Sequence, residues 1–321
     1  MAVADYGRLT AITRENMLPN VSDAIVQNSP GLHRFLNKAK KESGGTALHK
    51  IIRYANSTQG GGYTGLDVLT AAQQTTRTRA VWEWRQVYEP IAVSNIEIAK
   101  NKGAAGLEDL VAMEMEDAKL SLEDKFAGYF YGDGSGDSNQ VPEGLVNAVD
   151  DSSNDTTYGG INRSNYTWWA GSYAAGAGAF AVSLLSTRLD DIEQYGKAVD
   201  LHLTTLAMWT AYEQTLHPQA RFEFQSKGFP KADGGFDKLT YRGAEVLKDP
   251  YCTAGYWYML NTKTINYHYL NHPSFKTDSR GLTLWPLHEP TSQDGKIGFL
   301  LWYGAFICTN PRHNGVIRGL S

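Results

Sequence analysis

One long amphipathic helix is the strongest structural signal in this sequence of 321 residues. Over 107–131, apolar residues recur every three or four positions, the spacing that lines one face of an α-helix. These residues are Leu107, Val111, Met115, Ala118, Leu122, Phe126 and Tyr129. Acidic residues fill the opposite side, and Gly132 follows where glycine often ends a helix. At 1.5 Å per residue the helix is roughly 37 Å long, so we expect a spine along which the rest of the fold is arranged.

Two long strands are expected before this helix, joined by a glycine-rich loop. The first includes 49–54 and the second covers 77–98. The two-residue period of a strand places Trp82, Trp84 and Tyr88 on one face of the second strand. An isolated two-stranded ribbon is only marginally stable in water, so this aromatic face predicts contact with another subunit. The candidate contact residues of the ribbon are Tyr54, Gly60, Gly61, Gly62, Tyr63, Arg77, Arg79, Trp82, Trp84 and Arg85.

A second distinctive segment, 159–169, combines a glycine turn, one apolar residue, an arginine and a tandem tryptophan. It contains no nucleophile–base pair and no set of metal ligands. Such a motif indicates packing and assembly rather than catalysis. Its candidate residues are Gly159, Gly160, Arg163, Trp168 and Trp169.

The remaining elements predict an α+β fold. Residues 1–45 have the character of an arm, with a short helix that Pro30 begins and that continues to Leu36. After 141 a helix is expected near 178–195, a strand at 201–206 and a short helix that starts near Trp209 and is limited by Pro218. The C-terminal third is rich in strands, near 236–246, 256–260, 297–307 and 315–317. The sequence shows no strict repeat and no rhythm of a doubly wound sheet.

Composition excludes several classes of protein. The formal net charge is −4, and no block of Lys and Arg provides the electrostatic signature of a sequence-specific nucleic-acid binder. The N-terminus lacks the basic and apolar regions of a signal peptide. No apolar run approaches the ~18 residues that indicate a membrane span. Cys252 and Cys308 are far apart in sequence, and we expect two buried, reduced thiols.

Candidate chemical sites in the sequence are weak, so we expect no catalytic residue, no metal site and no cofactor. The polar run 133–139 resembles a calcium loop but lacks its spacing and closing Glu. Asp150 and Asp151 are expected to be solvated. His268 and His272 are four residues apart, without the Glu of a zinc-peptidase motif, and Cys308 is expected to pack as a small hydrophobe. The aromatic content of 12% leaves a glycan-active enzyme as the alternative among enzymes.

The order of these parts resembles the major capsid proteins of tailed double-stranded DNA bacteriophages, the family with the HK97-like fold. The likeness is carried by 81–86, by 159–169, by 236–246 with 257–262, and by 307–316. It implies an N-terminal arm (1–45), an extended two-stranded loop (46–100), a peripheral domain (101–140 and 236–295, with the spine helix), an axial domain (141–235) and C-terminal strands that return to the body (296–321).

The resemblance also implies a function. A protein of this family assembles from pentamers and hexamers into the icosahedral head shell that encloses packaged DNA, which it contacts without sequence specificity. Its partners would be further copies of itself, a scaffolding protein, a portal and decoration proteins, with no membrane. Its location would be the virion, after assembly in the bacterial cytoplasm. Encapsulins, which are cellular nanocompartments, resemble the same fold and remain an alternative. The Lys–Asn crosslink of some members is not expected, because no Lys lies near the glycine tip of the ribbon.

Overall fold

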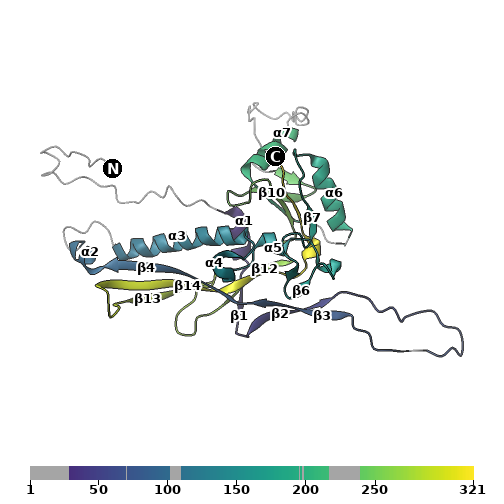
Figure 1. Ribbon diagram of the computed structural model, residues 1–321, viewed down its shortest axis with the longest axis horizontal. Helices are drawn as coiled ribbons and strands as arrows, with labels where there is room; N and C mark the ends of the chain where they lie inside the picture. Colours follow the sequence, from purple (N-terminus) through teal and green to yellow (C-terminus); the bar gives the residue numbers. More distant parts are fainter. Residues whose placement is uncertain (1–28, 70, 102–109, 195, 197–198, 217–238) are drawn as a thin grey trace, which may run out of the picture.

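The protein is elongated, with a ribbon projecting from one end of its body (Figure 1). A computed structural model describes residues 29–69, 71–101, 110–194, 196, 199–216 and 239–321. Helices and strands are mixed along the chain, which confirms the predicted α+β class.

A five-stranded sheet forms the long part of the body, and its central strand is β14 (Gly295–Cys308). Near its C-terminal end β14 pairs with β12, which in turn pairs with β1; nearer its N-terminal end it pairs with β13 and β4. The flanking strands are β1 (Lys40–Glu42), β4 (Arg85–Ser94), β12 (Ile265–Leu270) and β13 (Leu282–His288).

The predicted spine is helix α3 (Leu110–Phe130), which lies along β4 and β14 (Figure 1). Its apolar stripe is buried at Leu122 and Phe126, and the Phe126 ring packs edge-on against Trp302 of β14, with ring centroids 4.9 Å apart. On its polar side Lys125 pairs with Glu89 and Glu123 pairs with Arg280. The helix prediction is confirmed over 110–130, and 107–109 lie outside the described residues.

A second, six-stranded sheet runs in the order β7-β15-β11-β8-β10-β9. Alternate side chains of β11 face two cores: Trp257 and Met259 pack with helices α6 and α7, whereas Tyr258 and Leu260 face the main core. The helices are α6 (Val182–Glu193) and α7 (Leu206–Leu216). The strands are β7 (Ser172–Ala174), β8 (Leu201–Thr204), β9 (Leu239–Tyr241), β10 (Ala244–Lys248), β11 (Trp257–Leu260) and β15 (Gly315–Ile317).

The ribbon consists of β2 (Ala47–Arg53) and β3 (Arg77–Glu83), paired in antiparallel register from Ala47↔Glu83 to Arg53↔Arg77. The prediction of a single strand over 77–98 is wrong, because this stretch contains two strands and a helix. The chain leaves extended pairing at Trp84, and β4 then joins the five-stranded sheet. Helix α2 (Asn95–Lys100) follows, because Ser94 and Glu97 form a capping box that satisfies its first N–H groups.

The sheets divide the chain differently from the expected domain boundaries. Strand β4 lies within the expected extended loop (46–100) but belongs to the five-stranded sheet. Strands β9, β10 and β11 lie in the stretch 236–295 but pair with β8. The C-terminal stretch supplies one strand to each sheet, β14 and β15.

The short helix expected from Pro30 to Leu36 is confirmed, and it packs on the body. Helix α1 (Pro30–Leu36) buries Leu32, Phe35 and Leu36 in the main core. Its cap residue Ser29 donates a hydrogen bond of 2.6 Å to Asp249, and the Gly31 N–H donates to the same carboxylate oxygen at 3.0 Å.

Several short elements connect α3 to β7. They are α4 (Gly136–Asn139), α5 (Leu145–Ala148), β5 (Thr157–Tyr158), β6 (Ile161–Asn162) and the 3₁₀ turn η2 (Thr167–Trp169). A further 3₁₀ turn, η4 (Pro311–His313), links β14 to β15. Within the described residues no helix combines the length and apolarity that a membrane span requires.

Substitution Phe126→Ala should destabilise the protein by about 3–5 kcal/mol, because it leaves a cavity against Trp302. Gly128→Ala on the exposed side of the same helix should stabilise by up to about 1 kcal/mol, since its added methyl group meets no atom within 4 Å. Thermal unfolding of the two variants checks both values. Equal effects would contradict the packing described for α3.

Candidate functional site

The ribbon and the glycine–tryptophan motif, which lie far apart in sequence, meet where the ribbon leaves the body. We call this region the ribbon root. It comprises the ends of β2 and β3 nearest the body, the β5–β6 hairpin and turn η2. The end of strand β14 contacts the hairpin of this region: the Cys308 N–H donates a hydrogen bond of 2.7 Å to the Tyr158 hydroxyl.

Gly159 and Gly160 form the two-residue turn between β5 and β6. Their φ angles are 57° and 72°, the left-handed pair that tight hairpin turns require. The Gly159 carbonyl accepts a hydrogen bond of 2.9 Å from the Val81 N–H of β3. A methyl group on Gly159 would lie 3.0 Å from the Trp82 ring. The turn therefore needs glycine at this position both for its backbone and for the closeness of the ribbon.

Trp82 is only 5% exposed within a single copy of the chain. Its ring lies 5.9 Å from that of Tyr158 and 6.4 Å from that of Trp169. The expectation that the Trp82 face of the ribbon cannot be buried within the subunit is therefore wrong. The β5–β6 hairpin supplies the missing surface, a contact between segments about 80 residues apart that strand periodicity cannot reveal.

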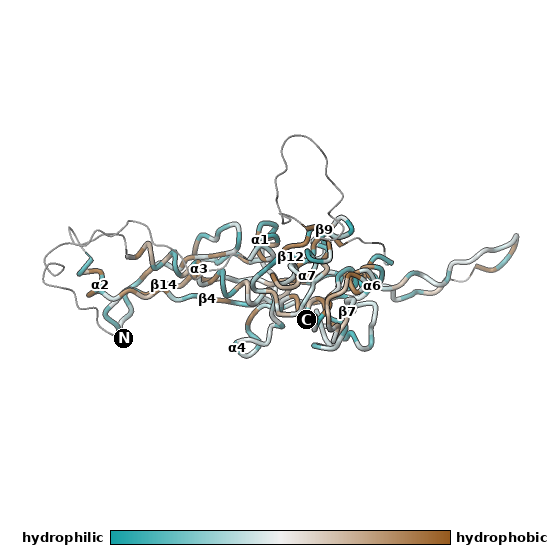
Figure 2. The backbone as a smooth tube through the Cα atoms, turned by 90° about the horizontal axis from the view of Figure 1, so that it is seen from above, coloured by the Kyte–Doolittle hydropathy of each residue, from teal (hydrophilic) through white to brown (hydrophobic). Residues whose placement is uncertain are grey.

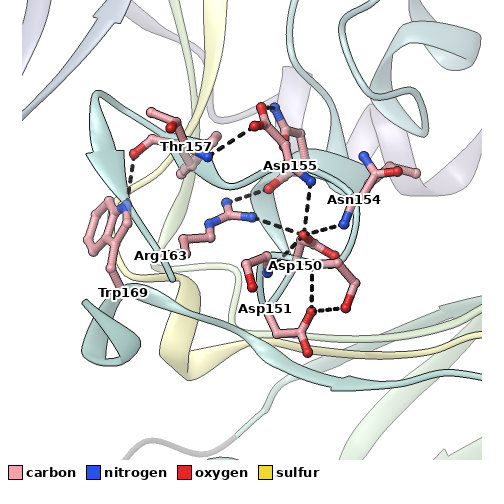
Figure 3. Close-up of polar contacts among 12 residues, drawn as sticks. Asp150, Asp151, Asn154, Asp155, Thr157, Arg163 and Trp169 are labelled. Carbon is pink, nitrogen blue, oxygen red and sulfur yellow. Dashed lines mark hydrogen bonds and ion pairs between the residues drawn. The ribbon is translucent and has the colours of Figure 1, made fainter. Parts of the chain in front are cut away.

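The tandem tryptophan braces the ribbon at two points. Trp168 stacks on Tyr54 at the end of β2, with ring centroids 5.2 Å apart and planes at 15°. Trp169 packs against Trp82 and donates a hydrogen bond of 2.9 Å to the Tyr158 carbonyl (Figure 3). The motif holds the ribbon in a fixed direction relative to the body.

Trp84 and Tyr88 do not continue the Trp82 face. Trp84 stands at the break between β3 and β4, where its ring N–H donates to the Gly45 carbonyl at 2.9 Å. Tyr88 is 62% exposed on β4 and contacts Phe299. The expected shared face fails because the two-residue period holds only while the strand is continuous.

The ribbon tip carries four of the ten large apolar side chains that are exposed in the described part of the chain. Gly60, Gly61 and Gly62 have no neighbouring atoms where a side chain would lie. Tyr63, Leu66, Val68 and Leu69 are all at least 66% exposed, and Figure 2 shows this hydrophobic end far from the body. Exposed apolar clusters of this kind mark sites of contact with other molecules.

Two of the three predicted ribbon arginines, Arg77 and Arg79, lie on the face of the ribbon opposite Trp82, whereas Arg85 belongs to β4. Arg77 and Arg79 are exposed, and Arg77 stands directly across from Arg53. Among the residues that the structure describes, no carboxylate forms an ion pair with Arg53, Arg77 or Arg79. Arg85 is half-buried, and its guanidinium lies 3.9 Å from the Glu83 carboxylate.

Arg163 is fully buried and pairs with Asp150, which is also 0% exposed. One guanidinium nitrogen of Arg163 lies 3.5 Å from the Asp150 carboxylate, and another donates to the Asn147 carbonyl. Burial lowers the pKa of Arg163, and the nearby Tyr158 and Asp150 oppose that shift. Its guanidinium also lies over the Tyr158 ring, so Arg163 ties the hairpin to the loop beneath it.

Asp150 organises that loop, contrary to the expectation that it is solvated. Its Oδ2 accepts hydrogen bonds from the N–H groups of Ser152, Asn154 and Asp155, at 3.0, 3.0 and 3.3 Å (Figure 3). Its Oδ1 lies 3.5 Å from Arg318, just after β15. The signal for this role is an Asp followed by small polar residues, a pattern that favours side-chain capping of a turn.

The other chemical candidates have structural roles. In the described part of the chain no three His, Cys, Asp or Glu side chains gather as metal ligands. Asp133 accepts two hydrogen bonds from Ser135, which lower its pKa and close a turn. His268 pairs with Glu42, whereas His272 stacks on Tyr303. Burial raises the pKa of the Cys308 thiol to about 12, so the thiol stays protonated.

No family model and no curated protein sequence matches the chain. Among solved structures, it is similar to the capsid of cyanophage A-1(L), with 17% identity and a TM-score of 0.76 over 97% of this chain and 98% of that chain. It is also similar to the capsid of the native GTA particle, with 11% identity and a TM-score of 0.63 over 100% of each chain.

A third similar structure is the SrpI encapsulin from Synechococcus elongatus PCC 7942, with 9% identity and a TM-score of 0.60 over 100% of this chain and 97% of that chain. The chain has the HK97-like fold. The HK97-like fold expected from the sequence is thus confirmed, with its spine helix and projecting ribbon.

Substitution Gly159→Ala should destabilise the protein more than Gly160→Ala. Both alanines would adopt a left-handed conformation, which costs about 1–2 kcal/mol, but only the methyl group at 159 would meet the Trp82 ring. Thermal unfolding of the two variants measures the difference. Equal losses of stability would show that the turn and the ribbon are not in close contact.

Substitution Asp150→Asn should cost about 3–5 kcal/mol, because it leaves two guanidinium groups without their carboxylate. The neighbouring Asp151→Asn is the matched control. Among the residues that the structure describes, Asp151 accepts hydrogen bonds from Ser153 alone, so its loss should cost no more than about 1 kcal/mol. Urea unfolding of both variants distinguishes the two roles, and a mild effect at 150 would argue against the buried ion pair.

Proposed function

We propose that this protein is the major capsid protein of a tailed double-stranded DNA bacteriophage. The observation that carries the proposal is the similarity to the cyanophage A-1(L) capsid along almost the full length of both chains. The TM-score to that capsid, 0.76, exceeds the 0.60 to the SrpI encapsulin. Under this proposal the protein acts in the virion, as a structural shell subunit.

The shape of the subunit supports a role in assembly. The ribbon extends beyond the body and ends in exposed apolar residues that no described part of the same copy covers. A neighbouring copy that receives this tip would bury it. Weak contacts repeated over pentamers and hexamers would then give a stable shell through multivalency.

The remaining partners belong to the same proposal. Assembly would take place in the bacterial cytoplasm with a scaffolding protein and a portal, and decoration proteins would add to the finished shell. The formal net charge of −4 suits a wall that encloses DNA without binding a specific sequence.

An encapsulin-like nanocompartment is the second candidate, favoured by the similarity to the SrpI encapsulin. The two functions differ in what the shell encloses. Electron microscopy of the purified protein, together with light scattering, tests for a shell. Nuclease-protected DNA in particles from infected cells would support the capsid, whereas a co-purifying enzyme would support the nanocompartment. A monodisperse monomer at high concentration, with scaffold added, would contradict both.

Substitution Gly61→Pro at the ribbon tip should reduce the yield of shells or give aberrant ones, because proline restricts a loop that would adapt to five- and six-fold neighbours. Gly61→Ala is the matched control, since an added methyl group there meets no atom within 4 Å. Particle counts by negative-stain microscopy provide the measurement. Normal shells from the proline variant would refute a role for tip flexibility.

A further inference from the structure

A cavity of about 300 Å³ opens at the ribbon root. Strand β3 lines one side, the β5–β6 turn another, and β14 the floor. Its chemically important side chains are Trp82, Glu83, Arg85, Glu143 and Phe306. The cavity shares Trp82, Gly159 and Gly160 with the packing of the ribbon root, but that packing leaves its interior unfilled.

Two buried polar atoms in the cavity wall have no hydrogen-bond partner among the described residues. One is the ring N–H of Trp82, a side chain that is 5% exposed. The other is the Oε2 atom of Glu143. Buried polar groups are almost always satisfied in folded proteins, so one donor and one acceptor in the same cavity point to an occupant that offers the complementary groups.

The charges in the cavity favour a cation as part of that occupant. Two carboxylates, Glu83 and Glu143, face one guanidinium, Arg85, which already lies near Glu83. Burial raises the pKa of Glu143, whereas Arg85 and Arg163 lower it and Asp155 and Glu83 raise it. The rings of Trp82 and Phe306 add aromatic surface, which attracts guanidinium groups.

The same molecule presents arginine side chains that form no ion pair with a described carboxylate. On the outer face of the ribbon, Arg53 stands directly opposite Arg77, and Arg79 follows on the same face. Like charges directly across a strand pair are unfavourable. The described part of the chain therefore holds a partly buried acidic cavity and an exposed group of arginines that have no carboxylate partner, although Arg53 donates a hydrogen bond to Asn56.

We propose that an arginine from the outer face of the ribbon of one copy docks in the ribbon-root cavity of a second copy. The guanidinium would pair with Glu143, and a backbone carbonyl of the docking strand would accept the Trp82 N–H. Within one copy no described carboxylate pairs with Arg79, which lies four residues, roughly 13 Å, along the strand from Glu83 at the cavity edge. The inference rests on the proposed function, because it requires many copies side by side.

The contact would be heterologous, since the ribbon of one copy meets a different surface of the next. Contacts of this type generate closed rings when the rotation between copies closes. The cavity would thus set the direction in which pentamers and hexamers are built.

The test uses pairs of full-length variants, each with one introduced cysteine, that are co-expressed and treated with a short bismaleimide. One partner carries Arg53→Cys, Arg77→Cys or Arg79→Cys, and the other carries Glu83→Cys at the edge of the cavity. Cys252 and Cys308 are buried in each copy and should not react. At least one pair should give a covalent dimer on a denaturing gel, whereas each variant alone should give none.

The matched control replaces Glu83→Cys by Glu116→Cys, an exposed acidic position on α3. Dimers formed as readily through position 116, or no dimers through position 83 in samples that contain shells, would overturn the proposal. Dimers through position 83 without any shells would support the contact and refute the capsid function. The absence of both dimers and shells would refute both. Circular dichroism of each variant confirms that it is folded.

Discussion

The packing of Trp82 against Tyr158 and Trp169 is the interaction on which the shape of this subunit depends. A two-stranded ribbon has no hydrophobic core of its own and is marginal in water. Here its base is inserted into the main core of the body, through a glycine turn that allows the backbone of the hairpin to approach the indole ring. The ribbon can therefore project a long way while its direction stays fixed.

A buried carboxylate with two arginine partners also stabilises the ribbon root. The buried Asp150 carboxylate lies between Arg163 of the hairpin segment and Arg318 near the C-terminus. Two segments more than 150 residues apart are thus held by one carboxylate, which also orders the loop that follows it. Since a buried charge without its partner is costly, the native arrangement is strongly preferred over one in which the hairpin separates from the body.

The sequence was sufficient for elements whose evidence is local. The apolar stripe of α3, the Pro30 start of α1 and the Gly159–Gly160 turn all have signatures within a few residues. The break at Trp84 was missed because both flanking segments have strand character, and only the competing partners, β2 and β14, separate them. The buried role of Asp150 was missed because it depends on Arg163 and Arg318, and pairing over such distances leaves no periodic pattern. The resemblance to capsid proteins predicted the fold as a whole, yet it carried no information about these contacts.

The direct passage from β3 to β4 has a mechanical consequence. A pull on the ribbon tip is transmitted along the chain through Trp84 into β4, whose ten residues are in register with β14 from Gly295 to Gly304. Because β4 pairs along its whole length, such a load shears its hydrogen bonds together instead of peeling them apart one at a time. The central strand β14 therefore also bears the mechanical load that β4 transmits to it. Strain that reaches one ribbon is spread over the full length of the five-stranded sheet.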